Sequence, residues 1–266
     1  MPDPKKRYRK PPIIEAIVEL LYDEDAPDPS VAGRFYEGWK ERCIRRDQFQ
    51  TQHVLIQFGP GTGAAPSAPP LPTERLWLSA RPGLAVQVGP GLLSIHFVRN
   101  PPLPEAGDGQ PYPGFEWFVP HVLAAVEHYR QLGSARGLKQ TSMRYINKID
   151  VPVGDDGIAE DWLTVGLSLP PSLVSIREFA ADIGMDLDSV GADFRYSVKA
   201  GPAVGGILGA WLDLRVTSKP DRRPTFETLA DWLRAAHDEG IIKPFEGSVT
   251  DNARKTFEVI DAITER

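Results

Sequence analysis

The sequence contains a single cysteine, Cys43, among 266 residues. One thiol cannot form an internal disulfide, which excludes a small disulfide-rich secreted domain. The chain also shows no secretory signal pattern, and the stretch 53–73, which has no charged residue, is interrupted by prolines and glycines. We therefore expect a cytoplasmic protein with no membrane-spanning segment.

Motifs that carry catalysis or bind cofactors are also missing. The sequence has no Walker loop, no G-x-S-x-G motif and no histidines or cysteines at metal-ligand spacing. Residues 59–64 match a relaxed dinucleotide-binding fingerprint, but the prolines from Pro66 onward exclude the helix that this motif requires. We predict no cofactor and no metal. This favours a non-catalytic protein and leaves an unrecognised enzyme as the alternative.

Basic residues are in the minority, with 30 Lys and Arg against 36 Asp and Glu and a formal net charge of −6. This balance argues against broad nucleic-acid binding, which requires clustered cations that neutralise phosphates. The exception is a basic run within 1–10, which we predict to be a flexible tail. The candidates there for contact with nucleic acid or an acidic partner are Lys5, Lys6, Arg7, Arg9 and Lys10.

What the sequence does contain is frequent alternation of apolar and polar residues, which is typical of strands with one buried face. The clearest case is 12–22, where Ala16, Val18 and Leu20 share one side. Further strands are predicted over 53–58, 75–80, 84–88, 93–97, 138–151, 174–186, 192–200 and 206–218.

Apolar residues at helical spacing predict the remaining elements. Helices are expected over 31–43, 115–132, 158–167, 226–239 and 250–260. Ser30, Thr225 and Thr250 are the expected N-caps, and Gly240 is the expected end of the fourth helix. Two proline-rich stretches are predicted as surface loops: 59–72 and 100–114.

The order β, α, several β, α occurs twice along the chain. We therefore predict a single α+β domain over 11–266, built from an antiparallel sheet with helices packed on one face. Its two halves, 11–135 and 138–266, are candidates for a degenerate duplication. A sheet curved around a helix would leave a cavity between them, and that is where we expect any ligand.

Polar residues at strand positions are the candidate site residues. In 138–151, alternation places Tyr145 and Asn147 on one face and Arg144 on the other. Asparagine is a poor strand former, so Asn147 among apolar neighbours predicts a hydrogen-bonding role.

These groups have two interpretations. The favoured one is structural, with an ion pair between Arg144 and Asp213 or between Glu15 and Arg215 on neighbouring strands. The alternative is a ligand site lined by Glu15, Arg144, Tyr145, Asn147 and Asp213.

Four segments resemble a sporadically distributed family of uncharacterised prokaryotic proteins of about this length. They occur in the family's order and span nearly the whole chain: Pro-Pro-Ile-Ile-Glu at 11–15, Val-Gln-Val-Gly-Pro-Gly-Leu-Leu-Ser at 86–94, Arg-Tyr-Ile-Asn-Lys-Ile at 144–149 and Phe-Glu-Gly-Ser-Val-Thr-Asp at 245–251. Two positions depart from the family pattern. His96 replaces a usual Asn, and Arg215 stands where a second acid is common.

The resemblance implies no established activity, but the family's patchy distribution implies a role in the bacterial accessory genome, as a toxin neutraliser or defence component. Our leading hypothesis is a non-catalytic cytoplasmic interaction module that binds a protein partner, or a second copy of itself, through its sheet edge or proline-rich loops. The rival hypothesis is a small-ligand-binding protein or unrecognised hydrolase with a cavity between sheet and helix.

Overall fold

The computed structural model describes residues 7–24, 28–51, 73–81, 83–99, 111–133, 135–152, 163–164, 179–201 and 207–260. Several sequence predictions lie outside these residues: the strand at 53–58, the loop at 59–72, most of the loop at 100–114, and the helix at 158–167 apart from Leu163 and Thr164.

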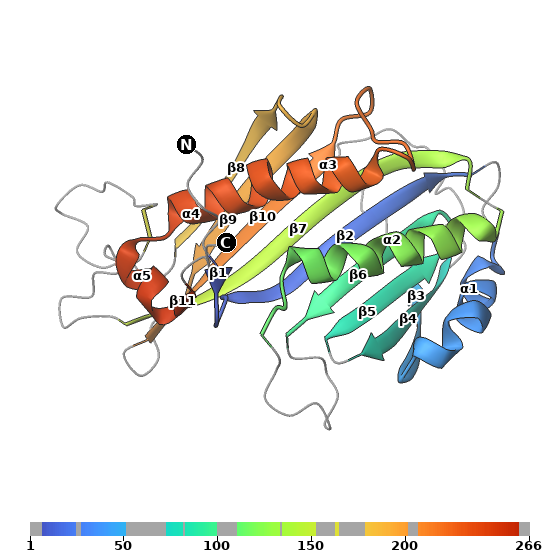
Figure 1. Cartoon of the computed structure of the whole chain (residues 1–266), viewed down its shortest axis with the longest axis horizontal. Helices are drawn as coiled ribbons and strands as arrows, with labels where there is room; N and C mark the ends of the chain where they lie inside the picture. Colours follow the sequence, from blue (N-terminus) through green and yellow to red (C-terminus); the bar gives the residue numbers. More distant parts are fainter. Residues whose placement is uncertain are drawn as a thin grey trace, which may run out of the picture.

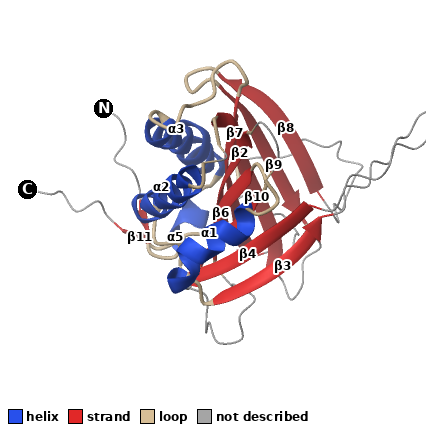
Figure 2. Cartoon of the chain, turned by 90° about the vertical axis from the view of Figure 1, so that its right-hand side faces the viewer, coloured by secondary structure: helices blue, strands red, loops and turns tan. Residues whose placement is uncertain are grey.

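The predicted α+β fold is confirmed, with an antiparallel sheet that carries helices on one face (Figures 1 and 2). The strands are β1 (Arg7–Tyr8), β2 (Ile13–Asp23), β3 (Arg45–Thr51), β4 (Thr73–Arg81), β5 (Leu84–Gly89), β6 (Leu92–Val98), β7 (Gly137–Pro152), β8 (Phe179–Leu187), β9 (Ala192–Ala200), β10 (Ile207–Ser218) and β11 (Val259–Ile260). The helices are α1 (Val31–Trp39), α2 (Phe115–Gln131), α3 (Leu229–Ala236), α4 (Lys243–Ser248) and α5 (Asp251–Thr256), with a 3₁₀ turn η1 (Lys40–Arg42) and a π-helix η2 (His237–Ile242).

Within the described ranges, nine strands form the main sheet in the order β3-β4-β5-β6-β2-β7-β10-β9-β8. In each half the first strand, β2 or β7, pairs with the last strand of the meander that follows it, β6 or β10. A helix, α2 or α3, comes next in the sequence. The duplication stays a prediction, because element order without matching residues does not establish it.

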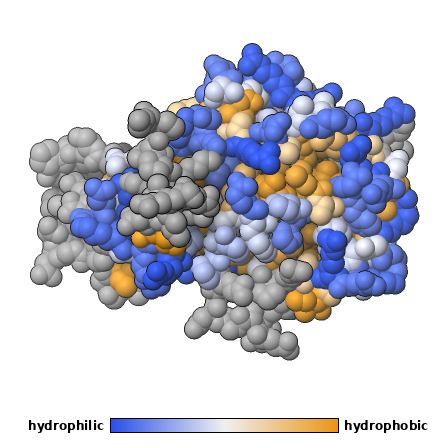
Figure 3. Space-filling model, viewed as in Figure 1, coloured by the Kyte–Doolittle hydropathy of each residue, from blue (hydrophilic) through white to orange (hydrophobic). Residues whose placement is uncertain are grey.

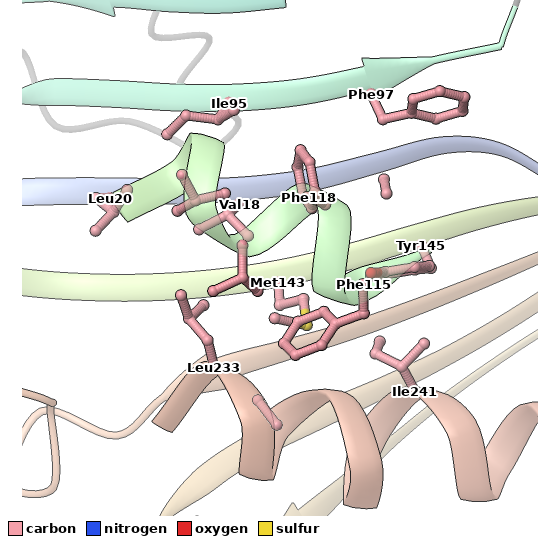
Figure 4. Packing of buried hydrophobic residues seen from close by; sticks show 14 of the residues in the cluster. Val18, Leu20, Ile95, Phe97, Phe115, Phe118, Met143, Tyr145, Leu233 and Ile241 are labelled. Carbon is pink, nitrogen blue, oxygen red and sulfur yellow. The ribbon is translucent and has the colours of Figure 1, made fainter. Parts of the chain in front are cut away.

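Alternation along the strands decides which face is buried. On β2, Ala16, Val18 and Leu20 are fully buried, whereas Glu15 on the opposite face is partly exposed. These side chains pack against apolar residues of α2 and α3, such as Phe118 and Leu233 (Figure 4). Each helix therefore covers an apolar stripe of the sheet, as the burial of apolar area requires.

One of the three predicted helix caps is wrong, and a second, Ser30, is correct in position only. Ser30 makes no side-chain cap, because its backbone N–H and its hydroxyl both donate to Asp28 Oδ1, at 2.8 and 2.7 Å. Thr225 lies before the helix, which begins only at Leu229, and bonds to Thr228 instead. The third prediction is confirmed, since the hydroxyl of Thr250 accepts from the N–H of residue 253.

Gly240 does not end its helix, contrary to the prediction. The chain continues through η2 into α4, and a Cβ atom at position 240 would lie 2.2 Å from Val216 Cγ2 on β10. Glycine is therefore required by the close approach of the helix to the sheet and not by a helix end. The polar edge strand β3 was not predicted, and β11 replaces the predicted end of the last helix.

The described part of the basic N-terminal run has partners. Strand β1 pairs with β11, and the backbone N–H groups of Arg9 and Lys10 donate to the carbonyls of Glu258 and Phe257, both at 2.9 Å. Lys10 also forms an ion pair with Glu258. Residues Lys5 and Lys6 lie outside the described ranges, and nothing of the side chain of Arg7 is described.

None of the helices in the described residues combines the length and the apolar character needed to cross a membrane. The helix-covered side of the molecule is mostly hydrophilic, with a hydrophobic patch between α2 and α3 (Figure 3).

Candidate functional site

The five predicted site residues do not lie together. As the alternation on β7 predicts, Tyr145 and Asn147 face the helices and are 1% and 2% exposed. Arg144, Asp213 and Glu15 lie on the opposite side of the sheet and are partly exposed.

Each of the two buried side chains forms a hydrogen bond within the fold. The Tyr145 hydroxyl lies 2.7 Å from the Tyr112 hydroxyl, and Asn147 Nδ2 donates to the Leu212 carbonyl at 3.2 Å. The Tyr145 ring also contacts the ring of His237, with 5.7 Å between centroids. Burial raises the pKa of Tyr145, so its phenol stays neutral. The surroundings of Tyr145 are therefore filled by side chains.

The predicted ion pair between Arg144 and Asp213 is present. Arg144 donates from Nε to Oδ1 at 2.8 Å and from Nη2 to Oδ2 at 2.5 Å, which is the bidentate geometry that favours arginine. These hydrogen bonds raise the pKa of Arg144. The alternative pair between Glu15 and Arg215 does not form, because β7 lies between their strands β2 and β10. Glu15 Oε1 lies 2.9 Å from His96 Nδ1 instead.

Glu15 belongs to a chain of hydrogen bonds that the sequence did not predict. Ser94 Oγ lies 2.9 Å from His96 Nε2, and the other ring nitrogen faces Glu15. This is the order of contacts in a Ser-His-acid triad. Ser94, however, is only 1% exposed and sits in the middle of β6 between two paired strands. A nucleophile must be reached by its substrate, so we interpret this chain as structural.

A row of three arginines is the most unusual feature of the side opposite the helices. Arg215 on β10 lies directly opposite Arg144 on β7 and Arg195 on β9. Like charges placed opposite each other on neighbouring strands are destabilising. Arg144 is neutralised by Asp213, and Arg195 donates from Nε to Asp182 Oδ1 at 2.7 Å.

Arg215, the central arginine of this row, has no such ion pair among the described residues. Arg215 is exposed and forms no hydrogen bond or ion pair with the described residues. The two flanking arginines hold Asp213 and Asp182, so Arg215 has no ion-pair partner among the described residues, although Asp193 lies diagonal to it on β9.

Two hollows lie on the same side of the sheet, over β7, β10, β9 and β8, which we call the open face. No helix among the described residues covers it (Figure 2). The first hollow, of about 680 Å³, is lined by Asp182, Gly184, Met185, Asp186, Asp193, Phe194, Arg195, Arg215 and Thr217. The second, of about 510 Å³, is lined by Arg144, Ile146, Asp182, Arg195, Ser197, Lys199, Trp211, Asp213 and Arg215.

An aromatic side chain stands at one end of the second hollow. Trp211 on β10 is 42% exposed and lies between Lys148 on β7 and Lys199 on β9 in the strand register. Lys148 forms an ion pair with Asp150 at 3.2 Å. The exposed indole therefore offers an apolar surface with the cation of Lys199 on one side and a paired lysine on the other.

The described residues hold no group of three or more side chains suited to bind a metal ion. Comparisons with protein-family models and with curated proteins found no match for this chain. The structure is that of an α+β protein whose antiparallel sheet carries helices on one face, with the open face on the other side. The family resemblance stays a prediction.

Proposed function

We propose that the protein is a non-catalytic interaction module that binds an acidic partner protein through its open face. The observation that carries the proposal is the uncompensated charge of Arg215 between two further arginines. A row of like charges costs stability in the isolated protein. A carboxylate of a partner, placed over Arg215, removes this cost.

The composition of the open face supports a protein partner. Arginine and tryptophan are the residues most enriched at the energetic centres of protein interfaces. Here Arg195, Arg215 and Trp211 gather around the second hollow, with Ile146 beside them. The guanidinium groups offer directional donors to carboxylates, and the indole offers apolar area.

The charge of this region also differs from that of the chain as a whole. The second hollow is lined by four cations and two carboxylates, although the chain has a net charge of −6. The second hollow is therefore locally positive, whereas the first hollow is lined by three carboxylates and two arginines, and a positive hollow on an acidic protein selects for partners with a matching negative segment.

Site-specific crosslinking in cells tests the proposal. A photoreactive phenylalanine analogue is placed at position 211 and, as a control, at Arg234 on α3, which is exposed on the helix side. We expect a discrete crosslinked protein from position 211 that is absent from position 234 and is lost with Arg215→Glu. Identical products from both positions would contradict the proposal.

The identity of the crosslinked protein then tests the finer proposals. A toxin or a defence protein would support the accessory-genome role that the resemblance implies. A crosslinked dimer of the chain itself would identify a second copy as the partner.

A small anionic ligand is the second candidate, favoured by the second hollow alone. Its volume of about 510 Å³ falls in the range of small-molecule sites. Thermal unfolding in the presence of inorganic phosphate or citrate separates the two candidates. A shift that Arg215→Glu abolishes would favour the small ligand, whereas no shift would favour the protein partner.

A further inference from the structure

We infer that the partner binds as an extended peptide segment that carries a cation, a carboxylate and an aromatic side chain in that order. This inference rests on the proposed function and specifies the chemistry of the partner. It comes from the way in which charge changes along the open face.

The two hollows adjoin each other on the open face, and we call them together the trough. They share Asp182, Arg195 and Arg215, and they extend in opposite directions from these residues. Along β10 the lining runs from Thr217 to Trp211. Six steps along a strand correspond to about 20 Å, the length of about seven extended residues.

One end of the trough is acidic. Asp186 and Asp193 face each other on β8 and β9 beside Thr217. Lys219 Nζ lies 2.5 Å from Asp186 Oδ1 and so neutralises that carboxylate, which lowers the pKa of Asp186. Asp193 forms no salt bridge with the described residues, although its charge also acts on Lys219, so the three carboxylates Asp186, Asp188 and Asp193 surround a single cation. This end therefore favours a cationic side chain.

The centre and the far end are basic. Arg215 lies two residues from Thr217 along β10, and Trp211 lies four residues beyond Arg215. Side chains of an extended peptide alternate between faces, so positions 1, 3 and 7 of a segment point the same way. The spacing matches a cation at position 1 over Asp193, a carboxylate at position 3 over Arg215, and an aromatic ring at position 7 on Trp211.

The part of the lining between Arg215 and Trp211, which faces position 5 of the segment, carries no unpaired charge. Asp213 shares this part of the lining with Ser197 and is held by Arg144. Position 5 of the segment consequently faces a paired carboxylate and a hydroxyl, and a small polar residue such as serine suits it.

Synthetic peptides of seven residues, blocked at both ends and labelled with a fluorophore, test the inference by fluorescence anisotropy. The probe has Lys at position 1, Glu at position 3, Ser at position 5 and Trp at position 7. Its matched control has the same composition with Glu moved to position 4, which turns the carboxylate to the other face. We expect the control to bind about tenfold more weakly.

A charge exchange shows whether Arg215 is the contact. Arg215→Glu is expected to lose binding of the probe by about tenfold or more and to regain it with a peptide that has Lys at position 3. Arg234→Glu on the helix side is the control variant and is expected to bind the probe as the parent does. If Arg215→Glu does not fold, a probe with Gln at position 3 tests the same contact on the parent protein and is expected to bind more weakly.

Four results would overturn the inference: no binding of the probe, equal binding of the probe and the shifted control, no loss with Gln at position 3, or tighter binding of oligothymidylate than of any peptide. The proposed function fails separately. A specific crosslink at position 211 together with unbound peptides leaves the interaction module standing and removes only the extended segment.

Discussion

Arg144 lies directly opposite Arg215 on β10 and forms a bidentate ion pair with Asp213 on that same strand. Asp213 lies two residues from Arg215 on the same strand and the same face. Asp213 is thus already engaged, and among the described residues Arg215 is the arginine of this row that has no ion pair. The proposed binding through the open face rests on this arrangement of pairs.

Gly240 is predicted to be essential for the close packing of η2 against the sheet. A methyl group there would overlap Val216, so Gly240→Ala is expected to destabilise the fold by about 1–3 kcal/mol in urea unfolding. Gly247→Ala in α4 is the matched control, because a Cβ there meets no atom within 4 Å, and it should be neutral or slightly stabilising. Equal effects of both substitutions would contradict this account.

The buried pair of tyrosines is predicted to act as a unit. Tyr112→Phe and Tyr145→Phe each leave the other hydroxyl without its partner, so each is expected to cost about 1–3 kcal/mol. The double variant removes both polar groups and should cost less than the sum of the single variants. Additive losses in a double-mutant cycle would show that the two hydroxyls do not interact.

Alkaline pH is predicted to unfold the protein through its buried phenols. Burial raises the pKa of Tyr22, Tyr112, Tyr129 and Tyr145 above the ordinary value of 10.0. A pKa raised in the folded state gives stability that is complete below pH 10.0 and is lost as the pH rises above it.

The urea midpoint should therefore fall between about pH 9 and about pH 11. Each buried tyrosine lowers the free energy of unfolding by at most about 1.4 kcal/mol per pH unit. The double variant Tyr112→Phe, Tyr145→Phe should fall less steeply than the parent. A midpoint that stays constant across this range would be the contrary result.

The Ser94–His96–Glu15 chain is predicted to be inert as a nucleophilic site. Because Ser94 is 1% exposed, a fluorophosphonate probe should not label it in the folded protein. Mass spectrometry of the treated protein checks this, with Ser94→Ala as the control. Stoichiometric labelling that disappears in Ser94→Ala would establish a reactive serine and overturn the non-catalytic interpretation.

Alternation along the chain was enough to predict much of this structure. It placed Tyr145 and Asn147 on one face of β7 and Arg144 on the other. Of the two ion pairs proposed for these strands, Arg144 with Asp213 is present and Glu15 with Arg215 is not. Period-two patterns report burial of one face, which is a local consequence of strand geometry, and the packing of helices on that face follows from it.

The central feature of the candidate site could not be predicted in the same way. The alignment of Arg215 with Arg144 and Arg195 depends on the strand order β7-β10-β9 and on register, which are set by contacts between residues distant in sequence. The contact of Glu15 with His96 joins residues 81 positions apart and depends on register too.

Residue types that predict helix ends and caps were misleading where a tertiary contact or another hydrogen-bond partner determined the local structure. Gly240 is of the residue type that predicts a helix end, but its small size serves packing against Val216. Ser30 is of the residue type that predicts a side-chain cap, but Asp28 accepts both of its donors. In each case the residue type was informative, but the reason for it lay elsewhere in the structure.

The measurement that tests the central claim most directly is urea unfolding of Arg215→Thr beside Arg144→Thr. If the charge of Arg215 is uncompensated in the free protein, Arg215→Thr should be as stable as the parent or more stable by about 0.2–1 kcal/mol, because it relieves repulsion in the row. Arg144→Thr should lose about 1 kcal/mol, since it breaks the half-buried pair with Asp213. A loss of stability in Arg215→Thr as large as that in Arg144→Thr would show that Arg215 is a structural residue and contradict the account.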